Sequence, residues 1–405
     1  MLAGNKIRVL IADDSTFMRK VLQSIISADP QMEVVGEARD GRDAVAKAES
    51  LKPDVITMDI NMPHMDGLQA TEVIMSSQPK PIVIVSSESR EGADITLKAL
   101  ELGAIDFVAK PSGGVDLDMN AVREELVRKL KMAAKVRVVR TATRSKLAHE
   151  IANGAPRTEP ASPLMAAVSS AMQSTVPPSA PTLPTFSPTL SATPVPTNGS
   201  AASARPAAKF PVVVISASTG GPATLMKLVP QFAKDFAGAV LLVQHMPGTF
   251  TSQFAAQLSD ASKIRVKEAE AGEMLQQGTF YVCPGSNHLR ISPTGRITLD
   301  DGPRISGYRP CADVTLETVA SFAGPMAISV VLTGMGNDSS QGVQAIKAGG
   351  GFVVAQDEAT SIIFGMPAEA IKTGAVDQVL SIDDIYHAVE KRVLYIFGAA
   401  RVGAL

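Results

Sequence analysis

The sequence predicts an α/β protein with two doubly wound parallel-sheet domains, joined by a linker rich in Pro, Ser, Thr and Ala. Two regions alternate short β-branched runs with helical patterns, which is typical of a parallel sheet covered on both faces. Between them, 11 of the 27 prolines fall within residues 156–206. Because residues 154–208 have little apolar surface to bury, they are predicted to be extended and largely disordered. We expect one domain at 1–132, a helix plus linker at 133–208, and a second domain at 209–400.

The first region contains short runs of buried, mostly β-branched residues that predict strands. These runs span residues 7–11, 55–58, 82–85 and 107–108. Helical patterns occupy residues 16–27, 41–50, 68–77 and 92–102. Strands that alternate with helices form a parallel sheet, so the residues that follow each strand meet at one edge.

Acidic, hydroxyl and basic residues follow these predicted strands. They are Asp13 and Asp14 after the first, Asp59 after the second, Ser86 after the third and Lys110 after the fourth. Converging carboxylates repel one another unless a cation lies between them, and hard oxygen ligands favour Mg²⁺. Lys110 and Ser86 would supply a positive charge and a hydroxyl donor to a phosphoryl group. The alternative is a set of solvated acidic loops, but the order of residue types fits phosphoryl chemistry better.

This region resembles the response-regulator receiver domain over residues 7–132. The segment Met-Pro-His-Met-Asp-Gly at 62–67 and the pair Lys110-Pro111 carry the resemblance. The resemblance implies that Asp59 accepts the phosphoryl group, with Ser86 and Lys110 in contact with it. It also implies that Phe107 repacks when Ser86 closes on that group. The implied Mg²⁺ ligands are Asp13, Asp14, Asp59 and the main-chain carbonyl of Asn61.

The second region opens with the most informative stretch of the chain, at residues 212–222. A β-branched run ends in Ser216-Ala217-Ser218-Thr219, and two glycines and a proline then suit the start of a helix. Ser218 therefore lies in a tight turn beside unpaired helical N–H groups, which suits a nucleophile that forms an oxyanion. A glycine-rich anion-binding loop is the alternative that this stretch leaves open by itself.

A histidine and an acid also follow predicted buried strands. Residues 240–244 run directly into His245, and residues 327–332 run into a loop that contains Asp338. The carboxyl ends of parallel strands line one crevice, so these residues and Ser218 can converge. A hydroxyl, an imidazole and a carboxylate are the groups that nucleophilic catalysis needs. The order Ser, His, Asp differs from that of α/β-hydrolases, so a different sheet is expected.

The chain has 5 histidines, and only His288 rivals His245 as the base. His64 and His149 lie in the N-terminal part, and His387 falls in a late polar helix. A lone histidine is most often structural. His245 is better placed because the following Met-Pro-Gly breaks the strand at once.

This second region is similar to the catalytic domain of the chemotaxis protein-glutamate methylesterases over residues 210–380. Separate motifs in the right order carry the resemblance, at 218–222, 244–247 and 332–338. Ser216 departs from the pattern of the family, which usually has glycine before the Ala-Ser pair.

The resemblance implies phosphorylation-activated hydrolysis of glutamate methyl esters on methyl-accepting chemoreceptors, with release of methanol and deamidation of receptor glutamines. A chemotaxis histidine kinase is the implied phosphodonor. The implied catalytic residues are Ser218, His245 and Asp338, and the backbone N–H groups of Thr219 and Met335 are implied to bind the oxyanion. No cofactor is expected in the catalytic domain. The alternatives are a serine esterase or amidase with another protein substrate, or an output module that acts by contact.

Composition narrows the functional classes further. The formal net charge of −2 gives no general attraction to nucleic acid or anionic lipid, and the basic residues 121–147 are interpreted as a solvated helix. The 2 cysteines, Cys283 and Cys311, cannot form a disulfide framework and are interpreted as reduced, small hydrophobic residues. No signal peptide or long apolar run is found, so we expect a cytoplasmic protein without direct membrane insertion.

Overall fold

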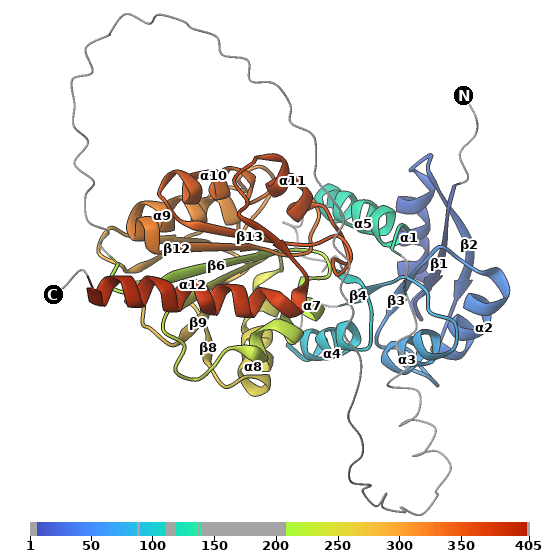
Figure 1. Ribbon diagram of the computed structural model, residues 1–405. Coiled ribbons are helices and arrows are strands. Elements are labelled where there is room, and N and C mark those ends of the chain that lie inside the picture. The colour runs from blue at the N-terminus through green and yellow to red at the C-terminus, as the bar shows by residue number, and fades with distance from the viewer. Residues whose placement is uncertain (1–5, 87–89, 111–118, 137, 139–207, 403–405) are drawn as a thin grey trace, which may run out of the picture. The chain divides into compact units, whose positions relative to one another are not determined.

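The computed structural model describes residues 6–86, 90–110, 119–136, 138 and 208–402 (Figure 1). These residues form two parallel α/β sheets, which confirms the predicted fold class. The predicted linker lies outside the described residues except for Ala208. This residue is buried, and its N–H donates to the Phe322 carbonyl at 3.3 Å, so it belongs with the second sheet rather than with the linker. The predicted basic helix at 121–147 is described only in part.

The first sheet has the strand order β2-β1-β3-β4-β5, with every pair parallel. Its strands are β1 (Ile7–Ala12), β2 (Met32–Ala38), β3 (Val55–Asp59), β4 (Ile82–Ser86) and β5 (Asp106–Ala109). The sequence did not predict β2. This edge strand is mostly half-buried and contains Glu33, Gly36 and Glu37, so it lacks the apolar run that marks a central strand.

Helices cover both faces of this sheet. They are α1 (Thr16–Ser27), α2 (Gly41–Leu51), α3 (Gly67–Ser77), α4 (Arg90–Glu101) and α5 (Met119–Ala133). Alternate residues of β1 point to opposite faces, so Val9 and Ile11 pack with α1 and α5, whereas Leu10 packs with α2, α3 and α4. Side chains of Ser15 and Asp66 cap the first turns of α1 and α3, which fixes where these helices begin.

The second sheet has the order β14-β13-β12-β6-β7-β9-β8, again with every pair parallel. Its strands are β6 (Val212–Ala217), β7 (Ala239–Gln244), β8 (Arg265–Glu268), β9 (Thr279–Val282), β12 (Ala327–Val331), β13 (Phe352–Gln356) and β14 (Gln378–Leu380). An antiparallel hairpin, which the sequence did not predict, is formed by β10 (His288–Ile291) and β11 (Ile297–Asp300).

Two sets of helices sandwich this sheet (Figure 1). One face carries α7 (Gly221–Leu228), α8 (Gly248–Ala261) and α12 (Ile382–Val402). The other carries α9 (Ala312–Ala323), α10 (Ser340–Ala348) and α11 (Met366–Lys372). Short 3₁₀ segments follow α7 and α9, at Val229–Gln231 and Gly324–Met326. Within the described ranges, no helix is both long and apolar enough to cross a membrane.

The strand order determines where a site can form. The first strand of the second sheet, β6, lies at its centre between β7 and β12. The chain leaves β6 toward β7 on one side and returns to β12 on the other, so the loops after these three strands meet at one edge of the sheet. Residues of β6 and β12 are completely buried, and each large apolar side chain there contributes roughly 1.5–3 kcal/mol by leaving water. The loops at this edge therefore follow a fully buried sheet centre.

Gly342 of α10 packs closely on α9, which provides a test of this helix pair. An added Cβ would lie 2.4 Å from the Leu316 Cβ, whereas an added Cβ at Gly398 of α12 meets nothing within 4 Å. Alanine in place of a helical glycine gains about 0.5–1 kcal/mol, but overpacking costs roughly 1–3 kcal/mol. We expect Gly342→Ala to lower the free energy of unfolding in urea and Gly398→Ala to preserve or raise it. Equal effects at both positions would contradict the close packing of α9 and α10.

Candidate active site

Ser218 lies in the loop between β6 and α7, at the carboxyl edge of the second sheet. Its N–H donates to the Thr333 carbonyl at 3.1 Å, which ties this loop to the loop after β12. A Cβ on Gly334 would lie 2.8 Å from the Ser218 Cβ, so only glycine permits this close approach. Gly220 is the N-cap residue directly before α7 and has a φ of 78°, a left-handed conformation that suits glycine. The tight turn predicted from the sequence is present.

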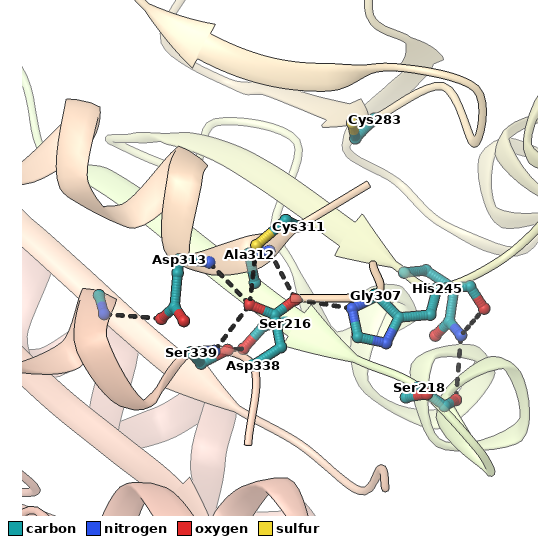
Figure 2. A network of polar contacts seen from close by, with 12 residues as sticks. Ser216, Ser218, His245, Cys283, Gly307, Cys311, Ala312, Asp313, Asp338 and Ser339 are labelled. Carbon is teal, nitrogen blue, oxygen red and sulfur yellow. Dashed lines mark hydrogen bonds and ion pairs between the residues drawn. The ribbon is translucent and has the colours of Figure 1, made fainter. Parts of the chain in front are cut away.

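His245 follows β7 and contacts Asp338 directly (Figure 2). The His245 Nε2 lies 2.7 Å from the Asp338 Oδ2. An ionised carboxylate only accepts hydrogen bonds, so a neutral His245 carries its proton on Nε2. Its Nδ1 is buried and has no hydrogen-bond partner among the described residues. The imidazole thus has one nitrogen held by Asp338 and a lone pair available on the other.

Asp338 is a completely buried carboxylate that several donors surround. Its additional donors are the Ala312 N–H (2.7 Å), the Asp313 N–H (2.9 Å), the Ser339 N–H (2.9 Å) and the Cys311 thiol (3.3 Å) (Figure 2). The first two come from the N-terminus of α9, where the helix dipole favours an anion. Burial acts to raise the pKa of Asp338, but His245 and these N–H groups outweigh it and lower the pKa. The carboxylate is therefore ionised at neutral pH.

Two neighbours of Asp338, Cys311 and Asp313, have raised pKa values. Burial is the main cause that raises the pKa of the Cys311 thiol to about 12, so the thiol donates to Asp338 at neutral pH. Burial also raises the pKa of Asp313 to about 6, although the Gly342 N–H donates to it at 2.7 Å. Cys311, Asp313 and Asp338 have ligand atoms within 4.8 Å of one another, and in this arrangement the thiol is a hydrogen-bond donor to Asp338. Cys311 is thus more than the small hydrophobic residue expected from the sequence.

Tyr308 packs its ring on His245, and sequence reasoning missed it. The two ring centroids are 4.5 Å apart, with an angle of 18° between the planes. A two-residue hairpin presents Tyr308, because its N–H and carbonyl both pair with Ile305, at 2.9 and 3.0 Å. The hydroxyl lies where a side chain on Gly336 would be, and burial raises its pKa. Tyr308 therefore contacts both His245 and the loop that contains Asp338.

His288 occupies a different environment. It lies in β10 of the antiparallel hairpin, is completely buried, and has its Nε2 3.1 Å from the Pro303 carbonyl. This main-chain contact indicates a structural histidine.

The backbone N–H groups of Thr219 and Met335 lie in the loops after β6 and β12. In the part of the chain that the structure describes, neither N–H has a hydrogen-bond acceptor. Neither donor is thus used by a hydrogen bond within the described residues.

A second cluster forms at the carboxyl edge of the first sheet. Ligand atoms of Asp13, Asp14 and Asp59 lie within 4.8 Å of one another. The Lys110 Nζ lies 3.0 Å from the Asp13 Oδ2 and 2.8 Å from the Asp59 Oδ1. Burial raises the pKa of Asp59, and the hydrogen bond from Lys110 only partly opposes it. Converging oxygen donors of this kind, which repel one another, are suited to Mg²⁺.

The other residues predicted for this cluster also lie near the same edge. Asn61 is exposed and is the second residue after β3. Ser86 is the buried last residue of β4, and its hydroxyl donates to the Gly92 carbonyl at 3.4 Å. Phe107 is buried in β5, where its carbonyl accepts from the Lys129 Nζ at 2.6 Å. Ser86 and Phe107 lie on neighbouring parallel strands.

Comparison with known proteins places the two halves in families. The CheB methylesterase profile matches residues 213–389, and the response regulator receiver domain profile matches residues 9–123. A protein-glutamate methylesterase/protein-glutamine glutaminase of Pyrococcus horikoshii is 42% identical over 406 residues, covering 99% of this chain and 98% of the relative. The chain belongs to this methylesterase family. A member from Symbiobacterium thermophilum is 40% identical, covering 96% and 97% of the two chains.

Solved structures of this family also match the two halves. The Thermotoga maritima CheB methylesterase catalytic domain is 38% identical, with a TM-score of 0.44, and covers 45% of this chain and 99% of that chain. The response regulator domain of Thermotoga maritima CheB is 50% identical, with a TM-score of 0.31, covering 33% and 99%.

Replacement of Tyr308 tests its contact with His245 in this methylesterase. Tyr308→Leu removes the ring face, whereas Tyr308→Phe keeps it and removes only the hydroxyl. We expect the leucine variant to lose about tenfold or more in kcat for ester hydrolysis, because a loosened imidazole is less often oriented for proton transfer. The loss of kcat in the phenylalanine variant should be several-fold smaller. If the two variants are equally impaired, the hydroxyl and not the stacked ring is the important contact.

Proposed function

We propose that this chain hydrolyses glutamate methyl esters on methyl-accepting chemoreceptors, and that phosphorylation of Asp59 activates it. The contact of His245 with Asp338, in the loops beside Ser218, is the observation that supports the chemistry most directly. Membership of the methylesterase family supports the substrate, because the matching relatives bear the name protein-glutamate methylesterase/protein-glutamine glutaminase. Residues that fit a phosphoryl site at the edge of the receiver sheet support the mode of control.

In the proposed mechanism, the Ser218 hydroxyl attacks the ester carbonyl while the His245 Nδ1 accepts its proton. Asp338 holds the imidazole through Nε2 and stabilises the imidazolium that forms. The Thr219 and Met335 N–H groups stabilise the tetrahedral oxyanion. The imidazolium then protonates the departing methoxide, which leaves as methanol, and the glutamyl group remains on Ser218 as an ester.

A water molecule completes the proposed cycle. The His245 Nδ1 takes a proton from the water as it attacks the glutamyl-Ser218 ester. The second tetrahedral intermediate collapses, the proton returns to the Ser218 oxygen, and the free glutamate side chain is released. A receptor glutamine would follow the same route, with its amide nitrogen protonated and released as ammonia. The names of the relatives include this glutaminase activity.

The receiver half would control this reaction through its acidic cluster. Asp59 would accept the phosphoryl group, with a chemotaxis histidine kinase as the donor. Asp13, Asp14 and Asp59, with the main-chain carbonyl of Asn61, would hold Mg²⁺, which when bound neutralises phosphoryl oxygens. The Lys110 ammonium, which lies 2.8 Å from the Asp59 Oδ1 in this structure, would form an ion pair with the phosphoryl group. Ser86 would donate its hydroxyl to that group, and Phe107 would repack as Ser86 moves.

The assignment of the catalytic residues can be tested by methanol release from a methylated receptor fragment. We expect Ser218→Ala to reduce the rate on the order of 10⁶-fold, because the loss of a triad nucleophile has an effect of this size. His245→Gln should be nearly as damaging, and Asp338→Asn severe but less so. His288→Gln is the matched control, since glutamine can still bond the Pro303 carbonyl. Methanol release by Ser218→Ala within roughly tenfold of wild type would remove Ser218 from the mechanism.

Control by phosphorylation predicts a response to a small phosphodonor. We expect acetyl phosphate with Mg²⁺ to stimulate methanol release by the full chain, and either Asp59→Asn or chelation of Mg²⁺ to abolish the stimulation. A fragment that starts at Arg205 should hydrolyse the ester without any phosphodonor if the unphosphorylated receiver inhibits. It begins before Ala208 because that residue is buried. A fragment no more active than the unphosphorylated full chain would instead indicate that the receiver activates or recruits.

A further inference from the structure

Two buried serine hydroxyls connect the strand before Ser218 to the loop that contains Asp338. Ser216 precedes Ser218 by two residues in β6, and Ser339 directly follows Asp338. Both serines are completely buried. The Ser339 hydroxyl donates to the Ser216 Oγ at 2.7 Å (Figure 2). The Ser216 hydroxyl donates to the Val330 carbonyl at 3.4 Å. The pair thus joins two segments that are 123 residues apart.

Ser339 adopts a backbone conformation that serine rarely takes. Its φ is 85°, in the left-handed region, where glycine has no steric penalty and a residue with a Cβ is strained. Such strain persists only where the surrounding contacts determine the conformation. In this conformation the Ser339 N–H donates to the Asp338 Oδ1 at 2.9 Å, and the residue lies at the N-terminus of α10 without a side-chain cap. The only side-chain hydrogen bond recorded for Ser339 in the described structure is the one to Ser216.

The strand geometry explains why Ser216 can reach Ser339. Val212 and Val214 of β6 pack with the helices α9 and α10, whereas Val213 and Ile215 pack on the opposite face. Alternation along the strand therefore directs Ser216 toward the side of α10.

We infer that the Ser216–Ser339 hydroxyl pair is a positioning device that holds Asp338 against His245. The pair fixes the strained conformation of Ser339, and that conformation directs the Ser339 N–H toward the Asp338 carboxylate. Without the pair, the backbone after Asp338 is no longer fixed in this conformation, whether or not the residue there is strained, and the carboxylate is held less firmly against the His245 Nε2. The kinetic test of this inference rests on the proposed function, because it measures the rate of methanol release.

The kinetic test compares variants that separate the hydroxyl pair from the strain. Ser216→Ala and Ser339→Ala each remove the pair, and Ser339→Gly removes both the hydroxyl and the strain. We expect each to lower kcat for methanol release by about tenfold with KM within about twofold, and the Ser216→Ala/Ser339→Ala variant to be no worse than its single parents. Ser329→Ala is the matched control. Ser329 is a completely buried serine of the adjacent strand β12, and its hydroxyl has no hydrogen-bond partner in the described structure.

Ser339→Gly distinguishes positioning from simple structural support. A purely structural role predicts that glycine, which relieves the strain, restores both stability and full kcat. Positioning predicts a variant that unfolds no more easily than wild type but remains slow. Full kcat in Ser339→Gly, or additive losses in the double variant, would overturn the inference.

A spectroscopic measurement makes the test independent of the substrate. The downfield proton NMR signal of the Nε2–H that His245 shares with Asp338 should be retained in Ser329→Ala and broadened or lost in the variants of the pair. If wild type releases no methanol, the proposed function fails, and this signal alone decides the inference. An unchanged signal in Ser216→Ala and in Ser339→Gly would refute it.

Discussion

A buried carboxylate needs hydrogen-bond donors, and this need determines much of the architecture around Asp338. An ionised group without partners would be very costly in a dry interior, so each of its lone pairs must be satisfied. The N-terminus of α9 supplies two N–H groups, Cys311 a thiol, Ser339 a third N–H, and His245 a ring N–H. Helix α9, the loop after β12 and the loop after β7 thus converge on one anion. The same contacts that make its burial tolerable also orient the imidazole.

The parallel sheet brings these segments together without any local sequence relationship. Because β6 lies between β7 and β12, the loops after these strands are neighbours although Ser218 and Asp338 are 120 positions apart in the chain. Glycines allow the approach where side chains would collide, as Gly334 does beside Ser218. In the receiver half, strands β1 and β3 are adjacent in the same way, and carboxylates at their ends converge. One topological rule therefore generates two chemically different clusters.

The sequence predicted those features that depend on strand ends and missed those that depend on packing partners. The positions of Ser218, His245 and Asp338 after strands could be predicted because each follows a run of apolar residues that is typical of a buried strand. Tyr308 lies in a short hairpin with no periodic pattern, so nothing in the sequence places its ring on His245. The sequence likewise does not reveal the left-handed φ of Ser339, because Ser216, its side-chain hydrogen-bond partner, lies 123 positions away in the chain.

The thiol beside Asp338 has a consequence for the chemical durability of the centre. Peroxides and alkylating reagents attack the thiolate form of cysteine, and burial raises the pKa of both Cys283 and Cys311. Both cysteines are free and buried, so each is a neutral thiol shielded from solvent. Burial, the main cause that raises the pKa of the Cys311 thiol, therefore also makes the sulfur beside Asp338 a weak nucleophile.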